Sequence, residues 1–259
     1  MFTGDPSRCE HPVPLTPNAE LRAYGAIDSD RPASKGHIVP STFVGSSAII
    51  FPMDGHVGVD ESGKGDFFGP LVIAACYVGP EHLAELEGVK DSKKLTDPIA
   101  LRLSVVIART CPHSVVAIGP AKYNELYEKF RNLNKLLAWG HARAIENVLE
   151  QQPCNLVISD QFADPAGLKR QLFEHGRQVT LQSMVRAEAD IAVAAASVLA
   201  RAEFLRRLKR LGEEFGIELP KGASPQVIAA GKRFVAQKGL GELPKVAKMH
   251  FKTVQSVVL

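Results

Sequence analysis

Residues 58–72 read GVDESGKGDFFGPLV and hold the most informative cluster of polar groups in this chain of 259 residues. Two adjacent carboxylates, Asp60 and Glu61, end a short apolar approach. Glycines then flank a lysine at Gly63–Gly65, and an apolar run follows at Leu71–Val78. Neighbouring like charges repel each other unless a cation or a proton compensates them, and glycine lets backbone approach a ligand closely. The stretch therefore predicts two strands joined by a turn that binds metal and phosphate.

Strand-like and helix-like patterns alternate through the rest of the chain. Strands are predicted at 57–59, 71–78, 114–118, 156–159 and 178–181, and helices at 98–109, 120–129, 134–151, 165–175, 189–211 and 224–237. The predicted elements begin with a strand meander, continue with alternating helices and strands, and end with helices. This order is expected of an α/β domain. It favours a mixed sheet flanked by helices over a fully parallel sheet.

The composition changes near residue 53. Residues 1–52 hold seven of the seventeen prolines and show no sustained period, so we expect a largely disordered lead-in, within which 39–52 could form one or two short strands. A compact domain is predicted at 53–259. The four cysteines are scattered without a CxxC pair, which is typical of a reduced cytoplasmic protein. No apolar run approaches the roughly 20 residues of a membrane span, so no membrane partner is expected.

Positive charge is concentrated at the C-terminal end. Residues 201–259 carry twelve basic and five acidic side chains, whereas residues 1–55 carry four basic and six acidic ones. A solvated helix face explains any single run of such charges. Their concentration in one part of the chain favours a polyanionic partner.

Two further positions could join Asp60 and Glu61 in a metal site. Asp160 ends an apolar strand, and Glu188 directly precedes an alanine-rich helix, where Asp190 is an alternative as cap, ligand or both. A set of oxygen ligands suits a hard cation, Mg²⁺ or Mn²⁺. Two such ions would clamp the attacking and leaving oxygens of an in-line phosphoryl transfer.

The glycine loop has a competing interpretation. Gly58 to Lys64 matches most of the nucleotide-binding pattern GxxxxGK[ST], but Gly65 replaces the hydroxyl that holds Mg²⁺, and a strand follows instead of a helix. The loop is better suited to one sugar-phosphate position. A second polar segment has the composition of a phosphate-positioning loop, with a flexible charged loop as the alternative. It comprises Lys90, Asp91, Ser92, Lys93 and Lys94.

Seven separated motifs resemble the type 2 ribonuclease H family, and within it ribonuclease HIII. They are GVDESGKGDFFGPL (58–71), VKDSKKLTD (89–97), YNELYEKFRNLNKLLAWGH (123–141), ISDQFAD (158–164), RAEADIAVAAASVLAR (186–201), LPKGAS (219–224) and KMHFKT (248–253). The resemblance implies a ribonuclease H-like α/β domain with a C-terminal helical extension. It also implies a monomeric endonuclease that cleaves the RNA strand of RNA–DNA hybrids and leaves 3′-hydroxyl and 5′-phosphate ends.

The resemblance also implies roles for individual residues. The family's metal-binding carboxylates fall on Asp60, Glu61, Asp160 and Glu188. Its glycine–basic–glycine motif, whose amides read ribose 2′-hydroxyls, falls on Gly63, Lys64 and Gly65, with Ser62 beside them. The Lys90–Lys94 segment resembles the family's phosphate-contacting loop.

One departure from the ribonuclease HIII pattern stands out. Those proteins carry an N-terminal substrate-binding platform, and residues 1–52 show no clear platform pattern, so the platform is reduced to 39–52 or absent. Three alternatives remain at this stage. They are incision at single ribonucleotides in duplex DNA, as in ribonuclease HII, a non-catalytic nucleic-acid-binding module, and a DNA nuclease on the same fold.

Overall fold

The computed structural model describes residues 55–89, 95–160, 165–184 and 187–259, all within one compact unit. The predicted lead-in at 1–52 and the Lys90–Lys94 segment lie outside the described residues. No helix in the described part of the chain is long and apolar enough to span a membrane.

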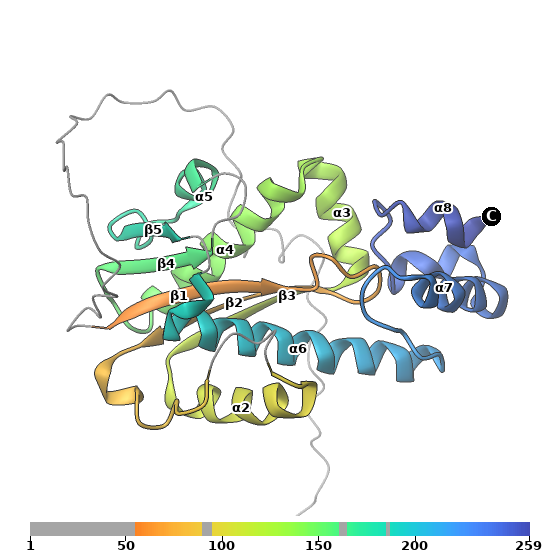
Figure 1. Cartoon of the computed structure of the whole chain (residues 1–259). Coiled ribbons are helices and arrows are strands. Elements are labelled where there is room, and N and C mark those ends of the chain that lie inside the picture. The colour runs from red at the N-terminus through yellow and green to blue at the C-terminus, as the bar shows by residue number, and fades with distance from the viewer. Residues whose placement is uncertain (1–54, 90–94, 161–164, 185–186) are drawn as a thin grey trace, which may run out of the picture. The chain divides into compact units, whose positions relative to one another are not determined.

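Five strands form one mixed sheet in the order β3-β2-β1-β4-β5 (Figure 1). Strands β1 (His56–Ser62), β2 (Leu71–Val78) and β3 (His113–Ile118) make an antiparallel meander. Strands β4 (Leu156–Asp160) and β5 (Thr180–Met184) extend the sheet in parallel from the other edge of β1. The expected mixed sheet is therefore confirmed.

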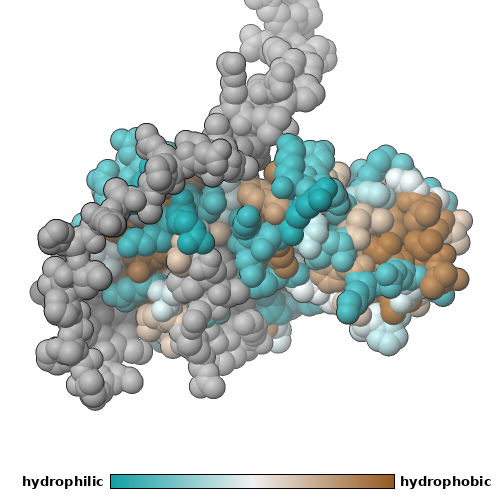
Figure 2. All heavy atoms as spheres, turned by 90° about the horizontal axis from the view of Figure 1, so that it is seen from above, coloured by the Kyte–Doolittle hydropathy of each residue, from teal (hydrophilic) through white to brown (hydrophobic). Residues whose placement is uncertain are grey.

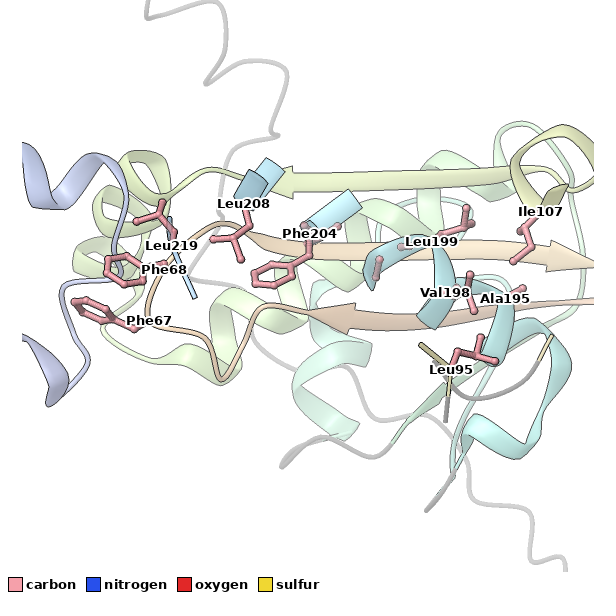
Figure 3. Close-up of a cluster of buried hydrophobic side chains, with 14 of the residues drawn as sticks. Phe67, Phe68, Leu95, Ile107, Ala195, Val198, Leu199, Phe204, Leu208 and Leu219 are labelled. Carbon is pink, nitrogen blue, oxygen red and sulfur yellow. The ribbon is translucent and has the colours of Figure 1, made fainter. Parts of the chain in front are cut away.

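Helices cover both faces of this sheet (Figure 1). Helices α2 (Asp97–Thr110) and α6 (Ile191–Phe215) lie on one face. The other face is covered by α3 (Pro120–Phe130), α4 (Leu133–Leu149) and α5 (Pro165–Gln171). Alternate residues of β2 enter the two resulting cores, which is why this strand is apolar throughout. Figure 3 shows part of the α6 core, from Ile107 and Ala195 to Phe204 and Leu208.

Gly58 lets α6 lie directly on β1. A β-carbon at this position would lie 2.1 Å from the backbone carbon of Ala192 and 2.1 Å from the backbone nitrogen of Val193. The first turns of α6 are rich in buried alanines for the same reason, since small side chains permit close approach. The first glycine of the motif thus has a packing role, and it brings the start of α6 to the strand that carries Asp60.

The C-terminal extension consists of α7 (Pro225–Lys238), the 3₁₀ helix η4 (Leu240–Lys245) and α8 (Thr253–Val258). Figure 2 shows apolar residues gathered at the end of the molecule that carries these elements. Their exposed members include Leu240 and Val258, which are 46% and 49% accessible. The extension also reaches back to the glycine loop, because Phe68 and Ala247 form an antiparallel β-bridge.

Several predicted boundaries were wrong. Helix α5 ends at Gln171 instead of 175, and β5 occupies Thr180–Met184 instead of 178–181. Helix α6 begins at Ile191 instead of 189, because Asp190 caps it and the preceding 3₁₀ turn η3 takes up Ala187–Ala189. It continues to Phe215, where Gly216 adopts the left-handed conformation that ends many helices. A short 3₁₀ helix, η1 (Pro80–His82), follows β2.

Candidate active site

Three of the predicted carboxylates, Asp60, Glu61 and Asp160, converge at the carboxyl ends of two neighbouring parallel strands. Strands β1 and β4 pair through Val59 and Ser159, so the next residues, Asp60 and Asp160, stand side by side at the end of the sheet. This edge is where open α/β sheets bind their ligands. A cleft of about 620 Å³ opens there. Its lining includes Asp60–Asp66, Asp160, Ser197, Arg201 and Lys221.

Asp60 and Glu61 point to opposite faces of the sheet. Successive side chains alternate along a strand, so Asp60 faces α6, where Ser197 hydrogen-bonds to it. Glu61 faces α4, where His141 Nε2 lies 3.0 Å from Glu61 Oε2. Both carboxylates nevertheless line the cleft. The pair is therefore held from two sides by two helices.

The two carboxyl groups have different environments. Burial and the neighbouring Glu61 charge raise the pKa of Asp60 to about 6. For Glu61, burial acts to raise the pKa, but the hydrogen bond and charge of His141, together with Lys64, lower it to about 2. Lys64 Nζ lies 3.4 Å from Glu61 Oε1. Negative charge at Asp60 is thus incompletely compensated by the protein, and a bound cation would stabilise it.

Asp160 and Glu188 are brought together by the turn before α6. The Ala187 N–H donates to Asp160 Oδ1 over 3.4 Å, and Glu188 is the next residue of η3. The position of the Glu188 carboxylate lies outside what the structure describes. Its backbone is nevertheless adjacent to the Asp160 end of the cleft.

Asp190 has a structural role. Its Oδ1 accepts hydrogen bonds from the N–H groups of Ala192 and Val193, 3.0 Å each, and its Oδ2 lies 2.7 Å from His56 Nε2. Both carboxylate oxygens are thereby engaged in capping α6 and tying it to the start of β1. Of the two roles that the sequence offers for Asp190, the structure shows the cap.

This assignment predicts opposite outcomes for two adjacent acidic positions. We expect Glu188→Gln to lower kcat for the expected hybrid cleavage by about 100-fold or more, because the change would remove an expected metal ligand. Asp190→Asn should keep activity within a few-fold and lower stability by about 1 kcal/mol, since the hydrogen bond to His56 is weakened. Steady-state cleavage measures kcat of both variants, and thermal unfolding measures their stability. An inactive Asp190→Asn beside an active Glu188→Gln would reverse the assignment.

The glycine loop lies where the sequence predicts it, at the wall of the cleft. Gly63 has a φ of +87°, and a β-carbon there would lie 2.2 Å from the carbonyl oxygen of Pro70. Gly65 faces open space. Ser62 ends β1, opposite Val72. Glycine is therefore required at 63 for the turn itself, whereas at 65 it leaves room for a ligand.

Two residues that line the cleft, Arg201 and Lys221, form a network with Asp97 to which the sequence pattern assigned no role. Asp97, the first residue of α2, accepts a hydrogen bond from Arg201 Nη2 and another from Lys221 Nζ, each 2.6 Å long. Burial opposes the effect, but these two cations lower the pKa of Asp97. Two cations on one carboxylate leave this network with one net positive charge at the wall of the cleft. Arg201 and Lys221 both lie inside quoted motifs, but only their approach in the fold shows the network.

Two other features of the described residues lie apart from this site. The side chains of Glu146, Glu150 and His175 offer ligand atoms within 4.8 Å of one another. Glu146 is, however, already engaged by the N–H groups of His175 and Gly176 and by the His175 ring, at 2.8–2.9 Å. A second cleft, of about 800 Å³, lies along the C-terminal half of α6, has a mostly apolar lining and contains none of the predicted site residues.

Comparison with known proteins agrees with this geometry. The ribonuclease HII family model matches residues 57–254. The chain belongs to the ribonuclease HII family. Ribonuclease HIII of Protochlamydia amoebophila is 47% identical over 205 residues, which cover 78% of this chain and 68% of that protein. Ribonuclease HIII of Chlamydia pneumoniae is 47% identical over 207 residues, covering 78% and 69%.

Solved structures place the chain in the same family. The crystal structure of Bst-RNase HIII in complex with Mn²⁺ is 33% identical and superposes with a TM-score of 0.74, covering 80% of this chain and 70% of that one. Aquifex aeolicus RNase H3 is 32% identical with a TM-score of 0.63, covering 77% and 73%. The expected ribonuclease H-like fold and the resemblance to ribonuclease HIII are both confirmed.

Proposed function

We propose that this ribonuclease HII family member is a divalent-metal-dependent endoribonuclease that cleaves the RNA strand of RNA–DNA hybrids. One observation carries the proposal. Asp60 and Asp160 stand at the carboxyl ends of adjacent parallel strands, in a cleft that also contains the Gly63–Gly65 loop and cationic side chains. Carboxylates for metal and a backbone loop for ribose are the two parts that hydrolysis of a hybrid requires.

The residues fit Mg²⁺ or Mn²⁺. Asp60, Glu61, Asp160 and Glu188 would supply an all-oxygen ligand set, which hard cations prefer. Asp60 in particular is buried with incompletely compensated charge. When bound, the ions stabilise charge on phosphate oxygens and promote deprotonation of water. The Mn²⁺ complex of Bst-RNase HIII supports the same cofactor class.

Neighbouring side chains orient these ligands. His141 is buried and fixes the direction of the Glu61 carboxylate from α4. Ser197 hydrogen-bonds to Asp60 from α6. The cap of this helix, Asp190, lies two residues after Glu188. Groups that hold metal ligands in place determine their geometry and basicity. We therefore assign His141 and Ser197 as positioning residues.

Substrate contacts are assigned to two sides of the cleft. Ser62 and the Gly63–Gly65 amides would read the 2′-hydroxyl at the position that is cut. Arg201 and Lys221 would contact backbone phosphates, held in place by Asp97. The Lys90–Lys94 segment, which lies outside the described residues, is proposed as a further phosphate contact. Such contacts position the duplex without reading its sequence.

A panel of end-labelled duplexes tests the proposed activity. The wild-type chain should cut the RNA strand of a hybrid in Mg²⁺ or Mn²⁺, leave a DNA duplex intact, and lose activity when the metal is chelated. Cutting at a single ribonucleotide within duplex DNA, in preference to the hybrid, would instead assign ribonuclease HII-type specificity. Binding without cleavage under all metal conditions would make the chain a non-catalytic module.

We also propose that residues 53–259 form a monomeric catalytic domain that acts in the cytoplasm, preceded by a separate lead-in at 1–52. Deletion of 1–52 should leave hybrid affinity and its salt dependence unchanged, because the basic C-terminal part supplies the phosphate contacts. The slope of log affinity against log salt measures the number of such contacts. A clearly shallower slope after deletion would show that the lead-in contributes to binding. Light scattering measures the molar mass in solution and so tests whether the protein is a monomer.

A further inference from the structure

Lys248 is a fully buried cation with no role in metal binding. Its side chain has 0% accessibility. Its Nζ donates to the carbonyl oxygens of Asp66 and Gly69, each at 2.8 Å. Burying an ammonium group is expensive unless polar partners compensate it. A lysine in such a place needs an explanation beyond filling the core.

The two carbonyls that Lys248 binds belong to the loop that continues the ribose-reading glycines. Asp66 follows Gly65 directly, and its N–H donates back to the Gly63 carbonyl over 3.3 Å. Gly69 ends the loop with a φ of +82°. The amine therefore spans the base of the loop from its first carbonyl to its last. Figure 3 shows Phe67 and Phe68 of the same loop among the apolar side chains near Leu208 and Leu219.

The segment that carries Lys248 is itself firmly attached. The Lys248 N–H donates to the Phe67 carbonyl over 2.9 Å, and the Gly69 N–H donates to the Val246 carbonyl over 2.9 Å. From α3, Asn124 Nδ2 donates to the Ala247 carbonyl over 3.0 Å, and Asn124 Oδ1 accepts from the Met249 N–H over 2.9 Å. The amine is thus presented to the loop by a rigid support.

We infer that Lys248 is a positioning residue for the Gly63–Gly65 loop, fixing through its buried amine the shape in which that loop meets ribose. This inference rests on the proposed function, because it assigns to Lys248 an indirect part in how the enzyme recognises ribose. The burial is chemically consistent with the role. Desolvation lowers the pKa of Lys248 to about 7, while the charge of Asp66 acts to raise it. Tyr123 of α3, whose ring centroid lies 5.6 Å from Nζ, and His250 are the other titratable groups identified around it.

Lys248→Met tests the role, because methionine keeps a long unbranched side chain without donors or charge. We expect the amides of Asp66, Phe67 and Gly69 to exchange hydrogen about tenfold faster or more, beyond any change in the sheet. KM for the hybrid should rise about tenfold with kcat within about threefold, since a loop that binds ribose is loosened and the metal ligands are not. Lys129→Met, at an exposed position of α3, is the matched control and should change neither quantity.

A pH series gives a second readout. The folded-state pKa of Lys248 lies below its ordinary value, so the unfolded chain binds more protons between about pH 7 and about pH 10, and wild-type stability gains with rising pH there. The unfolding midpoint of the wild type should therefore rise relative to that of Lys248→Met from about pH 7 to about pH 9. Lys248→Gln, which keeps two N–H donors without the charge, should show loop exchange and KM between those of the wild type and Lys248→Met.

Wild-type loop exchange and wild-type KM in Lys248→Met would overturn the inference, as would faster exchange spread evenly over the whole domain. If Lys248→Met does not fold, Lys248→Gln decides the question by the same two measurements. A wild-type chain that fails to cut hybrids would refute the proposed function alone. The exchange measurement would still decide whether Lys248 holds the loop.

Discussion

Asp160→Asn is expected to abolish cleavage of RNA–DNA hybrids while leaving hybrid binding measurable. Asp160 stands beside Asp60 at the end of β4, and its carboxylate lines the cleft. Replacing it by the neutral amide keeps its size but removes the charge of a proposed metal ligand. Stabilisation worth several kcal/mol would be lost from the transition state, which corresponds to a decrease in kcat of about 10³-fold.

Single-turnover cleavage and fluorescence anisotropy on the same labelled hybrid separate the two effects. Binding should survive because Gly63–Gly65, Arg201 and Lys221 are unchanged. Glu128→Gln, on the exposed surface of α3, is the control for loss of one negative charge. Full activity of Asp160→Asn would remove this residue from the catalytic set.

Gly58→Val is expected to lower stability by about 3 kcal/mol or more. A β-carbon at this position would overlap the backbone of Ala192 and Val193, which cannot move aside as a flexible side chain could. Helix α6 would have to lift from β1, and overpacking of this kind is strongly destabilising. For a domain of this size, the melting temperature should fall by about 6–12 °C or more.

Gly65→Ala is the matched stability control within the same motif, because a β-carbon at Gly65 meets nothing within 4 Å. Its melting temperature should stay within about 2 °C of the wild type. Thermal unfolding of both variants in the same buffer makes the comparison. A wild-type melting temperature for Gly58→Val would mean that α6 does not lie against β1 as described.

Much of the fold could be predicted because local patterns and tertiary packing agree. The apolar run of β2 is buried on both faces, and the alanine-rich start of α6 lies where close approach requires small side chains. The predicted helix boundaries were wrong where a single side chain determines the end of the helix. Asp190 caps α6 through the N–H groups of Ala192 and Val193 and also contacts His56, and no periodicity in the sequence reveals the contact with His56.

The site was predictable where its residues are consecutive or end an element. Asp60, Glu61, Gly63–Gly65 and Asp160 are of this kind, and their convergence follows from parallel pairing of β1 with β4. His141 and Lys248 were not predictable, because each reaches the site across long sequence separation. A histidine inside an amphipathic helix and a lysine in a basic tail resemble ordinary surface residues until the fold buries them.

We propose that the strand-end carboxylates hold divalent metal for cleavage, and calorimetric titration with Mn²⁺ measures this binding. The wild-type chain should bind Mn²⁺, and Asp60→Asn should lower the affinity by at least about tenfold, with unfolding temperature unchanged or raised because a buried charge is removed. Equal Mn²⁺ affinity in the wild type and in a folded Asp60→Asn variant would contradict the claim.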